Sequence, residues 1–288
     1  MHFNAQLAAA QQQHDSLLCV GLDPEPERFP LPWRGDPDRI FDFCSAIVDA
    51  THDRVCAFKP QIAYFAAHRA EAQLERLVAH IRRVAPAVPV ILDAKRGDID
   101  SSAAQYAREA FVRYQADAVT LSPFMGFDSI EPYLAYQGRG LFLLCRTSNA
   151  GGSDLQDQLL ARGDRLYEHI ARLAAGRWNR DGNLGLVVGA TVLPELARVR
   201  ELAPTLPLLI PGIGAQGGDL QATVAAAWRR DGPIIVNASR SVLYAAEAGE
   251  PAGAASEGQD GIEAFAAAAR AAARRARDDL AAACAVLR

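Results

Sequence analysis

Charged residues directly follow an apolar stretch in the segment VPVILDAKRGDID, residues 88–100. The stretch VPVIL is typical of a buried strand, and Asp93, Lys95 and Asp98 come straight after it. Residues two apart on a strand share a face, so Asp93 and Lys95 should point the same way, with Asp98 close enough on the following loop to join them. A buried network of opposite charges rarely adds as much stability as apolar packing. We therefore favour a catalytic cluster over a salt-bridge cluster that only closes the end of the fold.

Lysine is almost absent from this chain. Of the 30 basic residues, only Lys59 and Lys95 are lysines, which leaves 28 arginines. Both lysines follow apolar runs, VCAF and VPVILDA. The compact lysine ammonium can lose and regain a proton near neutral pH, which arginine cannot do. If the two lysines were present by chance, we would not expect both of them to follow an apolar run. We therefore predict that both belong to one site. With Asp93 and Asp98 they would balance two positive against two negative charges.

Two further segments could bind a ligand. The first, PGIGAQGG at 211–218, contains G-x-G-x-x-G, but it comes late and no ribose-binding acid ends the next strand, so a dinucleotide site is a weak interpretation. The next strand instead ends in NASRS with Arg240, which favours a phosphate site over an ordinary tight turn. The second segment, RTSNAGG at 146–152, is either a turn with a helix cap or a group of hydroxyls and amides that recognises a polar heterocycle.

Eight short apolar runs alternate with amphipathic segments, a pattern that predicts a parallel sheet covered by helices. Eight such units favour a single-domain (β/α)₈ TIM barrel over residues 1–288, with a Pro-rich insertion at 24–37, a loop at 245–261 and a C-terminal helix at about 262–287. Chemistry in such barrels lies at the carboxyl ends of the strands. The runs are 16–22, 55–58, 88–92, 117–121, 141–145, 184–189, 206–210 and 233–238, and the helical segments are 37–50, 71–85, 101–115, 155–175, 194–202 and 219–230.

Composition excludes several classes of partner. The net charge is −4 with no basic block, so nucleic acid and anionic membrane surfaces are poor candidates, and no run is long enough to span a membrane. Five widely spaced cysteines without a C-x-x-C indicate buried thiols in a reducing cytoplasm. The six histidines show no metal-ligand spacing, so we expect no metal.

Taken together, the motifs GLD, FKP, LDAKRGDI, TSN, PGIGAQGG and ASRS resemble orotidine 5'-phosphate decarboxylase, in the branch that carries D-A-K-R-G-D-I. The resemblance implies decarboxylation of orotidine 5'-phosphate to UMP in pyrimidine biosynthesis, by a cytoplasmic homodimer with shared active sites and without cofactor. It makes Lys95 the proton donor to C6 and Asp93 the carboxylate that faces the substrate's carboxylate. The other implied site residues are Lys59 and Asp23 at the ribose; Asp98, Ile99 and Ser102 in the partner's site; Ser148 and Asn149 at the pyrimidine; and Gly214, Gln216, Gly217, Ser239 and Arg240 at the phosphate.

Two positions depart from the family's usual pattern: Ser102 replaces a threonine, and Ala150 follows Ser148-Asn149 where proline is frequent. Neither belongs to the charged network. The main alternative is a sugar-phosphate decarboxylase (3-keto-gulonate 6-phosphate type) or aldolase of the same superfamily, which also carries D-x-K-x-x-D. Such relatives use magnesium, and Lys59 and the Ser-Asn pair argue against them. A non-catalytic phosphate-ligand binding protein is disfavoured by the intact charged residues.

Overall fold

Eight parallel strands form one barrel in the computed structural model, which describes residues 2–213, 218–248 and 259–287. The strands pair in the order β2-β1-β8-β7-β6-β5-β4-β3, and parallel bridges Phe58–Val90 and Gln61–Asp93 join β2 to β3. All eight predicted strands are present, and the (β/α)₈ barrel is confirmed. The strands are β1 (Leu18–Leu22), β2 (Ala57–Pro60), β3 (Ile91–Arg96), β4 (Ala118–Leu121), β5 (Gly140–Arg146), β6 (Leu184–Val188), β7 (Leu208–Pro211) and β8 (Ile234–Ala238).

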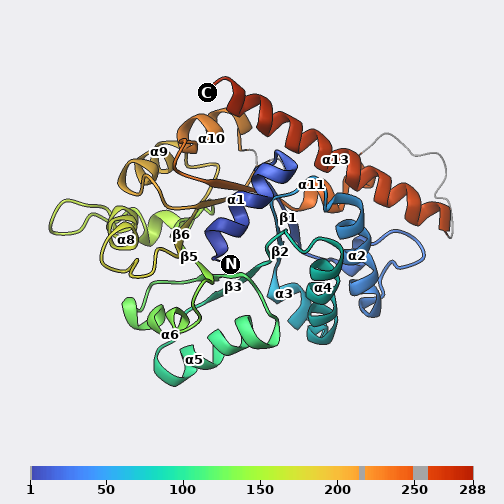
Figure 1. Cartoon of the computed structure of the whole chain (residues 1–288), viewed down its shortest axis with the longest axis horizontal. Helices are drawn as coiled ribbons and strands as arrows, with labels where there is room; N and C mark the ends of the chain where they lie inside the picture. Colours follow the sequence, from blue (N-terminus) through green and yellow to red (C-terminus); the bar gives the residue numbers. More distant parts are fainter. Residues whose placement is uncertain (1, 214–217, 249–258, 288) are drawn as a thin grey trace.

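Helices cover the outside of this barrel (Figure 1). They are amphipathic, as in α4, where Leu74, Leu77, Val78 and Ile81 form the buried face. The long helix α13 packs against α2 and α10. The covering helices are α2 (Ile40–Thr51), α3 (Ile62–Ala66), α4 (Glu71–Val84), α5 (Asp100–Arg108), α6 (Glu131–Leu134), α7 (Gly152–Leu155), α8 (Leu166–Ala175), α9 (Leu193–Leu202), α10 (Leu220–Ala227), α11 (Arg240–Leu243), α12 (Ala245–Ala248) and α13 (Gln259–Ala285).

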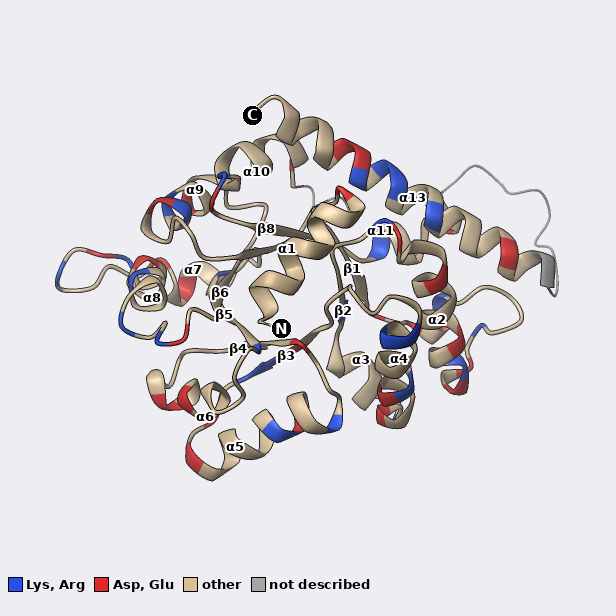
Figure 2. Ribbon diagram, viewed as in Figure 1, with Lys and Arg blue, Asp and Glu red and all other residues tan. Residues whose placement is uncertain are grey.

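Helix α1 (Phe3–His14), which the sequence reasoning did not anticipate, lies across the middle of the ring of strands (Figure 1). It carries no Lys, Arg, Asp or Glu, whereas charges of both signs are spread over the outer helices (Figure 2). Phe3 and Leu7 pack with Ile91 and Phe142 from inside the barrel, and the Phe3 and Phe142 rings meet edge to face with centroids 5.6 Å apart. Helix α1 therefore closes the end of the barrel at which the strands begin.

Several predicted boundaries were wrong, among them that of β3, which spans Ile91–Arg96 rather than 88–92 and so includes Asp93 and Lys95. The segment 155–175 is helical only from Leu166, where α8 begins, because α7 ends at Leu155 and the chain reverses at Gly163 (φ 94°), where Leu159 bridges Arg165. Helix α10 ends at Ala227 rather than at 230, because Trp228 has extended dihedrals. The stretch 245–261 is helical at both ends, as α12 and the start of α13, and residues 249–258 lie outside the described part. The insertion at 24–37 contains a 3₁₀ turn, Pro26–Arg28, and stacks Phe29 on Phe43 of α2.

Candidate active site

The side chains that point into the barrel change from apolar to polar along its axis. At the end closed by α1 they form an apolar layer that includes Ala57, Ile91 and Ala118. Two residues further along the same three strands come Lys59, Asp93 and Thr120, because alternate residues of a strand face the interior. These polar side chains line a cavity of about 760 Å³ at the carboxyl ends of the strands. The rest of the apolar layer is Cys19, Cys56, Phe142, Val187, Leu209 and Ile235, with Phe3 and Leu7 of α1 beneath.

At the floor of the cavity, one carboxylate lies between two ammonium groups. Lys59 Nζ is 2.8 Å from Asp93 Oδ2, and Lys95 Nζ is 2.6 Å from Asp93 Oδ1. The Lys59 side chain is 5% exposed and that of Asp93 10%, whereas that of Lys95 is 45% exposed. The structure thus brings together three of the four predicted charged residues and leaves Lys95 as the accessible ammonium.

Lys59 and Asp93 keep each other in the charged form. Burial alone would lower the pKa of Lys59, but the carboxylates of Asp93 and Asp23 outweigh it and raise that pKa above its ordinary value. Burial would likewise raise the pKa of Asp93, but the ammoniums of Lys59 and Lys95 hold it well below its usual range. Both side chains are therefore charged throughout the neutral range.

The remaining predicted acids, Asp23 and Asp98, are placed differently. Asp23 follows β1 and lines the cavity, and its Oδ1 is a buried acceptor that has no hydrogen-bond partner among the described residues. Among the described residues Asp98 forms no ion pair with either lysine, and its Oδ1 accepts a hydrogen bond from the amide of Ile99 at 2.8 Å. Among the described residues that line this cavity, Asp98, Ile99 and Ser102 are missing. Their role in a partner's site stays a prediction.

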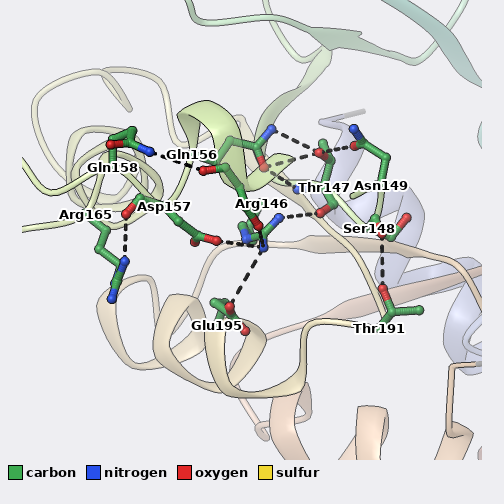
Figure 3. Close-up of polar contacts among 11 residues, drawn as sticks. Arg146, Thr147, Ser148, Asn149, Gln156, Asp157, Gln158, Arg165, Thr191 and Glu195 are labelled. Atoms are coloured by element: carbon green, nitrogen blue, oxygen red, sulfur yellow. Dashed lines mark hydrogen bonds and ion pairs between the residues drawn. The ribbon is translucent and has the colours of Figure 1, made fainter. Parts of the chain in front are cut away.

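The loop after β5 brings Ser148 and Asn149 to the cavity wall (Figure 3). The Ser148 backbone lies directly against Gly189, where an added Cβ would sit 2.6 Å from Ser148 Cβ. The carbonyl of Ser148 also accepts a hydrogen bond of 3.5 Å from the Thr191 hydroxyl. Thr147 donates to Asn149 Oδ1 at 2.6 Å. The segment is therefore held by close packing against Gly189 and by Thr191, and its two interpretations, a turn with a helix cap and recognition of a polar heterocycle, both stay predictions.

Arg146, the last residue of β5, fixes the other side of this loop, and the sequence reasoning missed it. Its side chain is 6% exposed and forms an ion pair with Asp157 at 2.9 Å (Figure 3). The guanidinium also donates to the Thr147 carbonyl at 2.8 Å and to Ser153 at 3.2 Å. The available signal was a charged residue closing the apolar run LFLLCR, as in the two lysine-bearing runs.

The ends of β7 and β8 form the opposite wall of the cavity, where Gly212, Ser239 and Arg240 lie. Ser239 approaches β1 so closely that a Cβ at Gly21 would be 1.9 Å from its hydroxyl oxygen, so a glycine is needed there. Arg240 is exposed and begins α11. The predicted phosphate contacts Gly214, Gln216 and Gly217 lie outside the described residues.

Other predictions concern the whole molecule. All five cysteines are free and buried, as predicted. In the part of the chain that the structure describes, no helix combines the length and apolar character needed to cross a membrane. Within the same residues, no three His, Cys, Asp or Glu side chains gather as the ligands of a metal ion would.

Comparison with known proteins identifies the family. Residues 16–257 match the model of the Orotidine 5'-phosphate decarboxylase / HUMPS family. A Methylibium petroleiphilum protein named orotidine 5'-phosphate decarboxylase is 72% identical over 263 residues, covering 88% of this chain and 95% of that protein. The chain belongs to the orotidine 5'-phosphate decarboxylase family. A Paracidovorax citrulli protein of the same name is 68% identical over 283 residues, covering 97% of this chain and 98% of its own length.

The solved structures agree with the family assignment. Leishmania donovani OMP decarboxylase has a TM-score of 0.82 and 37% identity, covering 98% of this chain and 99% of that one. The family model's description spans two groups, but the relatives at 72% and 68% identity carry the name orotidine 5'-phosphate decarboxylase. The sugar-phosphate alternative is therefore not favoured.

Proposed function

We propose that this member of the orotidine 5'-phosphate decarboxylase family converts orotidine 5'-phosphate to UMP and CO₂ in de novo pyrimidine biosynthesis, with Lys95 as the proton donor. The names of the relatives at 72% and 68% identity support the overall reaction. The assignment of Lys95 rests on one observation in the cavity: of the two ammoniums on Asp93, only that of Lys95 is well exposed, at 45% against 5% for Lys59. A substrate can therefore reach Lys95, while Lys59 balances the buried carboxylate.

The proposed step needs no redox partner. Breaking the bond between C6 and the substrate's carboxyl group releases CO₂ and leaves the electron pair on C6. The Lys95 ammonium stabilises this pair and transfers one proton to C6, which gives UMP and a neutral amine that water reprotonates. Asp93, which would face the substrate's carboxylate, holds Lys95 in place through the 2.6 Å contact.

The rest of the substrate fits the two ends of the cavity. The unpartnered Oδ1 of Asp23, beside Lys59, would accept a hydrogen bond from a ribose hydroxyl. Ser148 and Asn149 would read the pyrimidine edge from the β5 side, and Ser239 and Arg240 would bind the phosphate from the β8 side. Because the phosphate does not react, its binding energy can position the ring over Lys95. Gly214, Gln216 and Gly217 complete the proposed phosphate site.

We also propose that the enzyme works as a cytoplasmic homodimer in which Asp98, Ile99 and Ser102 complete the partner's site. Two observations support this. Ile99 is 40% exposed although apolar, and Phe124, on the loop after the neighbouring strand β4, is 75% exposed. Gly97 packs on Ser122, so the two loops that carry these exposed apolar side chains are adjacent. Exposed apolar side chains of this kind suit burial against a second copy.

An ultraviolet assay of orotidine 5'-phosphate in the presence of EDTA tests the proposal. We expect turnover by the wild-type chain, and a loss of nearly all turnover in Lys95→Arg, which keeps the charge but has no proton to give at neutral pH. Lys95→Arg should remain folded and still bind UMP. Arg180→Lys, at an exposed ion pair with Glu131, is the matched control and should be fully active. Lys95→Arg turnover within tenfold of wild type would refute the proton-donor assignment.

A further inference from the structure

Thr120, the third residue of β4, makes three hydrogen bonds inside the charged cluster. Its side chain is buried, with the residue 1% exposed. Thr120 Oγ1 accepts hydrogen bonds from the backbone amides of Ala94 and Lys95, both at 3.0 Å. The same hydroxyl donates to Asp93 Oδ1 at 2.9 Å. One hydroxyl therefore contacts both the backbone of Lys95 and the carboxylate that holds its ammonium.

The direction of the Thr120 proton is fixed by these partners. A hydroxyl has one proton to donate and two lone pairs to accept with. The two amides can only donate, so they occupy the lone pairs, and the ionised carboxylate of Asp93 can only accept. Asp93 Oδ1 thus accepts hydrogen bonds from the Thr120 hydroxyl and the Lys95 ammonium, and Oδ2 accepts one from the Lys59 ammonium. The carboxylate is thereby held against rotation on both oxygens.

The backbone that carries Asp93 and Lys95 depends on the same hydroxyl. Leu92 pairs with Val119 and Arg96 with Leu121, so four steps along β3 match two along β4. Inside this bulge, Lys95 has a φ of 47°, a left-handed conformation that residues other than glycine seldom adopt. The amides of Ala94 and Lys95 donate to Thr120 Oγ1 in place of a backbone carbonyl of the neighbouring strand. Bulges beside active sites commonly change the direction in which a side chain points, here that of Lys95.

We infer that Thr120 is a positioning residue for the decarboxylation: its hydroxyl sets the backbone of Lys95 and the orientation of Asp93, and through them the place of the Lys95 ammonium. The inference rests on the proposed function of Lys95. It predicts that loss of the hydroxyl slows the chemical step without weakening nucleotide binding, because in this structure the hydroxyl's three partners all belong to β3. A misplacement of about 1 Å at a reacting group costs roughly 10²-fold in rate.

Isosteric substitution tests the inference with little risk to folding. Thr120→Val keeps the shape of the side chain and removes the hydroxyl, whereas Thr120→Ser keeps the hydroxyl. We expect kcat to fall by roughly 10²-fold in Thr120→Val, with KM and the Kd for UMP changed less than about threefold, and Thr120→Ser to recover most of the rate. Thr51→Val is the matched control, because Thr51 is also buried and donates only to the carbonyl of Ile47, at 2.7 Å. It should retain the wild-type kcat.

A second measurement does not depend on turnover. Protein labelled with ¹⁵N-lysine has two lysine amides, so the hydrogen exchange of the Lys95 amide can be followed by NMR. Exchange should be severalfold faster in Thr120→Val than in wild type or Thr120→Ser, and unchanged in Thr51→Val. If wild-type protein fails to turn over orotidine 5'-phosphate but this exchange pattern holds, the proposed function fails and the positioning role survives. Unchanged exchange, a Thr120→Val kcat within threefold of wild type, or a serine variant as slow as the valine variant would each overturn the inference.

Discussion

Replacing Asp93 with Asn should show how much the charged cluster contributes to the free energy of unfolding. The substitution keeps the shape of the side chain but leaves Lys59, 5% exposed, without the carboxylate that lies 2.8 Å from it. Removing one partner of a buried ion pair typically costs about 3–5 kcal/mol, because the remaining charge stays buried and uncompensated. Asp23 still acts on Lys59 through its charge, so we expect the lower part of that range.

The pH dependence of this loss follows from the two pKa shifts. In the wild type the pKa of Lys59 is raised above 10.5, so its contribution to stability is complete below that pH and is lost as pH rises through the folded-state value. The pKa of Asp93 is lowered, so its contribution is complete above about pH 4 and is lost only in stronger acid. Without Asp93, burial acts on Lys59 against Asp23 alone, and the pKa of Lys59 falls. The variant should therefore differ from wild type by the full amount while its Lys59 stays charged, and by less as pH rises through the lowered pKa of Lys59.

Urea unfolding at one fixed protein concentration, repeated from pH 6 to pH 10, measures this difference. Glu131→Gln is the matched control, because it makes the same carboxylate-to-amide change in an exposed ion pair of 3.0 Å, where both side chains are more than half exposed. Its cost should stay below about 1 kcal/mol. The reasoning is refuted if Asp93→Asn loses no more stability than Glu131→Gln.

Three other predictions concern the rest of the molecule. Arg240→Ala should raise KM for orotidine 5'-phosphate strongly and barely change the slow reaction of the phosphate-free nucleoside; equal losses on both substrates would remove Arg240 from the phosphate site. Co-refolded Lys95→Ala and Asp98→Ala chains should recover roughly a quarter of all sites in a two-fold dimer; no recovery, with mixed dimers present, would place Asp98 in its own chain's site. Arg200, 1% exposed, lies within hydrogen-bond distance of six backbone carbonyls, which its five N–H groups share, so Arg200→Met should cost about 3 kcal/mol or more in urea unfolding, and a cost below 1 kcal/mol would contradict this reasoning.

The sequence predicts the strands well because a strand buried on both sides is a nearly continuous apolar run. Lys59, Asp93 and Lys95 could then be placed at one end of the barrel from their positions just after such runs. The position of Asp98 could not, because it follows the bulge between Leu92 and Arg96, where the two-residue period of a regular strand no longer holds. How the loop leaves that bulge depends on contacts with β4.

The residues that were missed share a cause. Thr120 lies within the run DAVTL, where a threonine is an ordinary strand residue, and its role depends on the amides of another strand. Helix α1 shows no apolar period, because Ala and Gln separate its few large apolar residues. Its position depends on the open end of the barrel, which exists only once the strands have closed. Local pattern therefore predicts the elements, while these contacts arise from tertiary packing.

Because the two lysines differ in exposure, one of them can be modified selectively by reagents that react with amines. Acylating reagents modify primary amines and leave arginine intact, and Lys59 is shielded. Apart from the chain's own α-amino group, one amine remains accessible, that of Lys95 in the cavity. A fluorescent or isotopic tag attached there would report directly on the occupancy of the cavity. A bound nucleotide should protect the amine, so the labelled fraction of a sample would count its empty sites, without any cysteine being introduced.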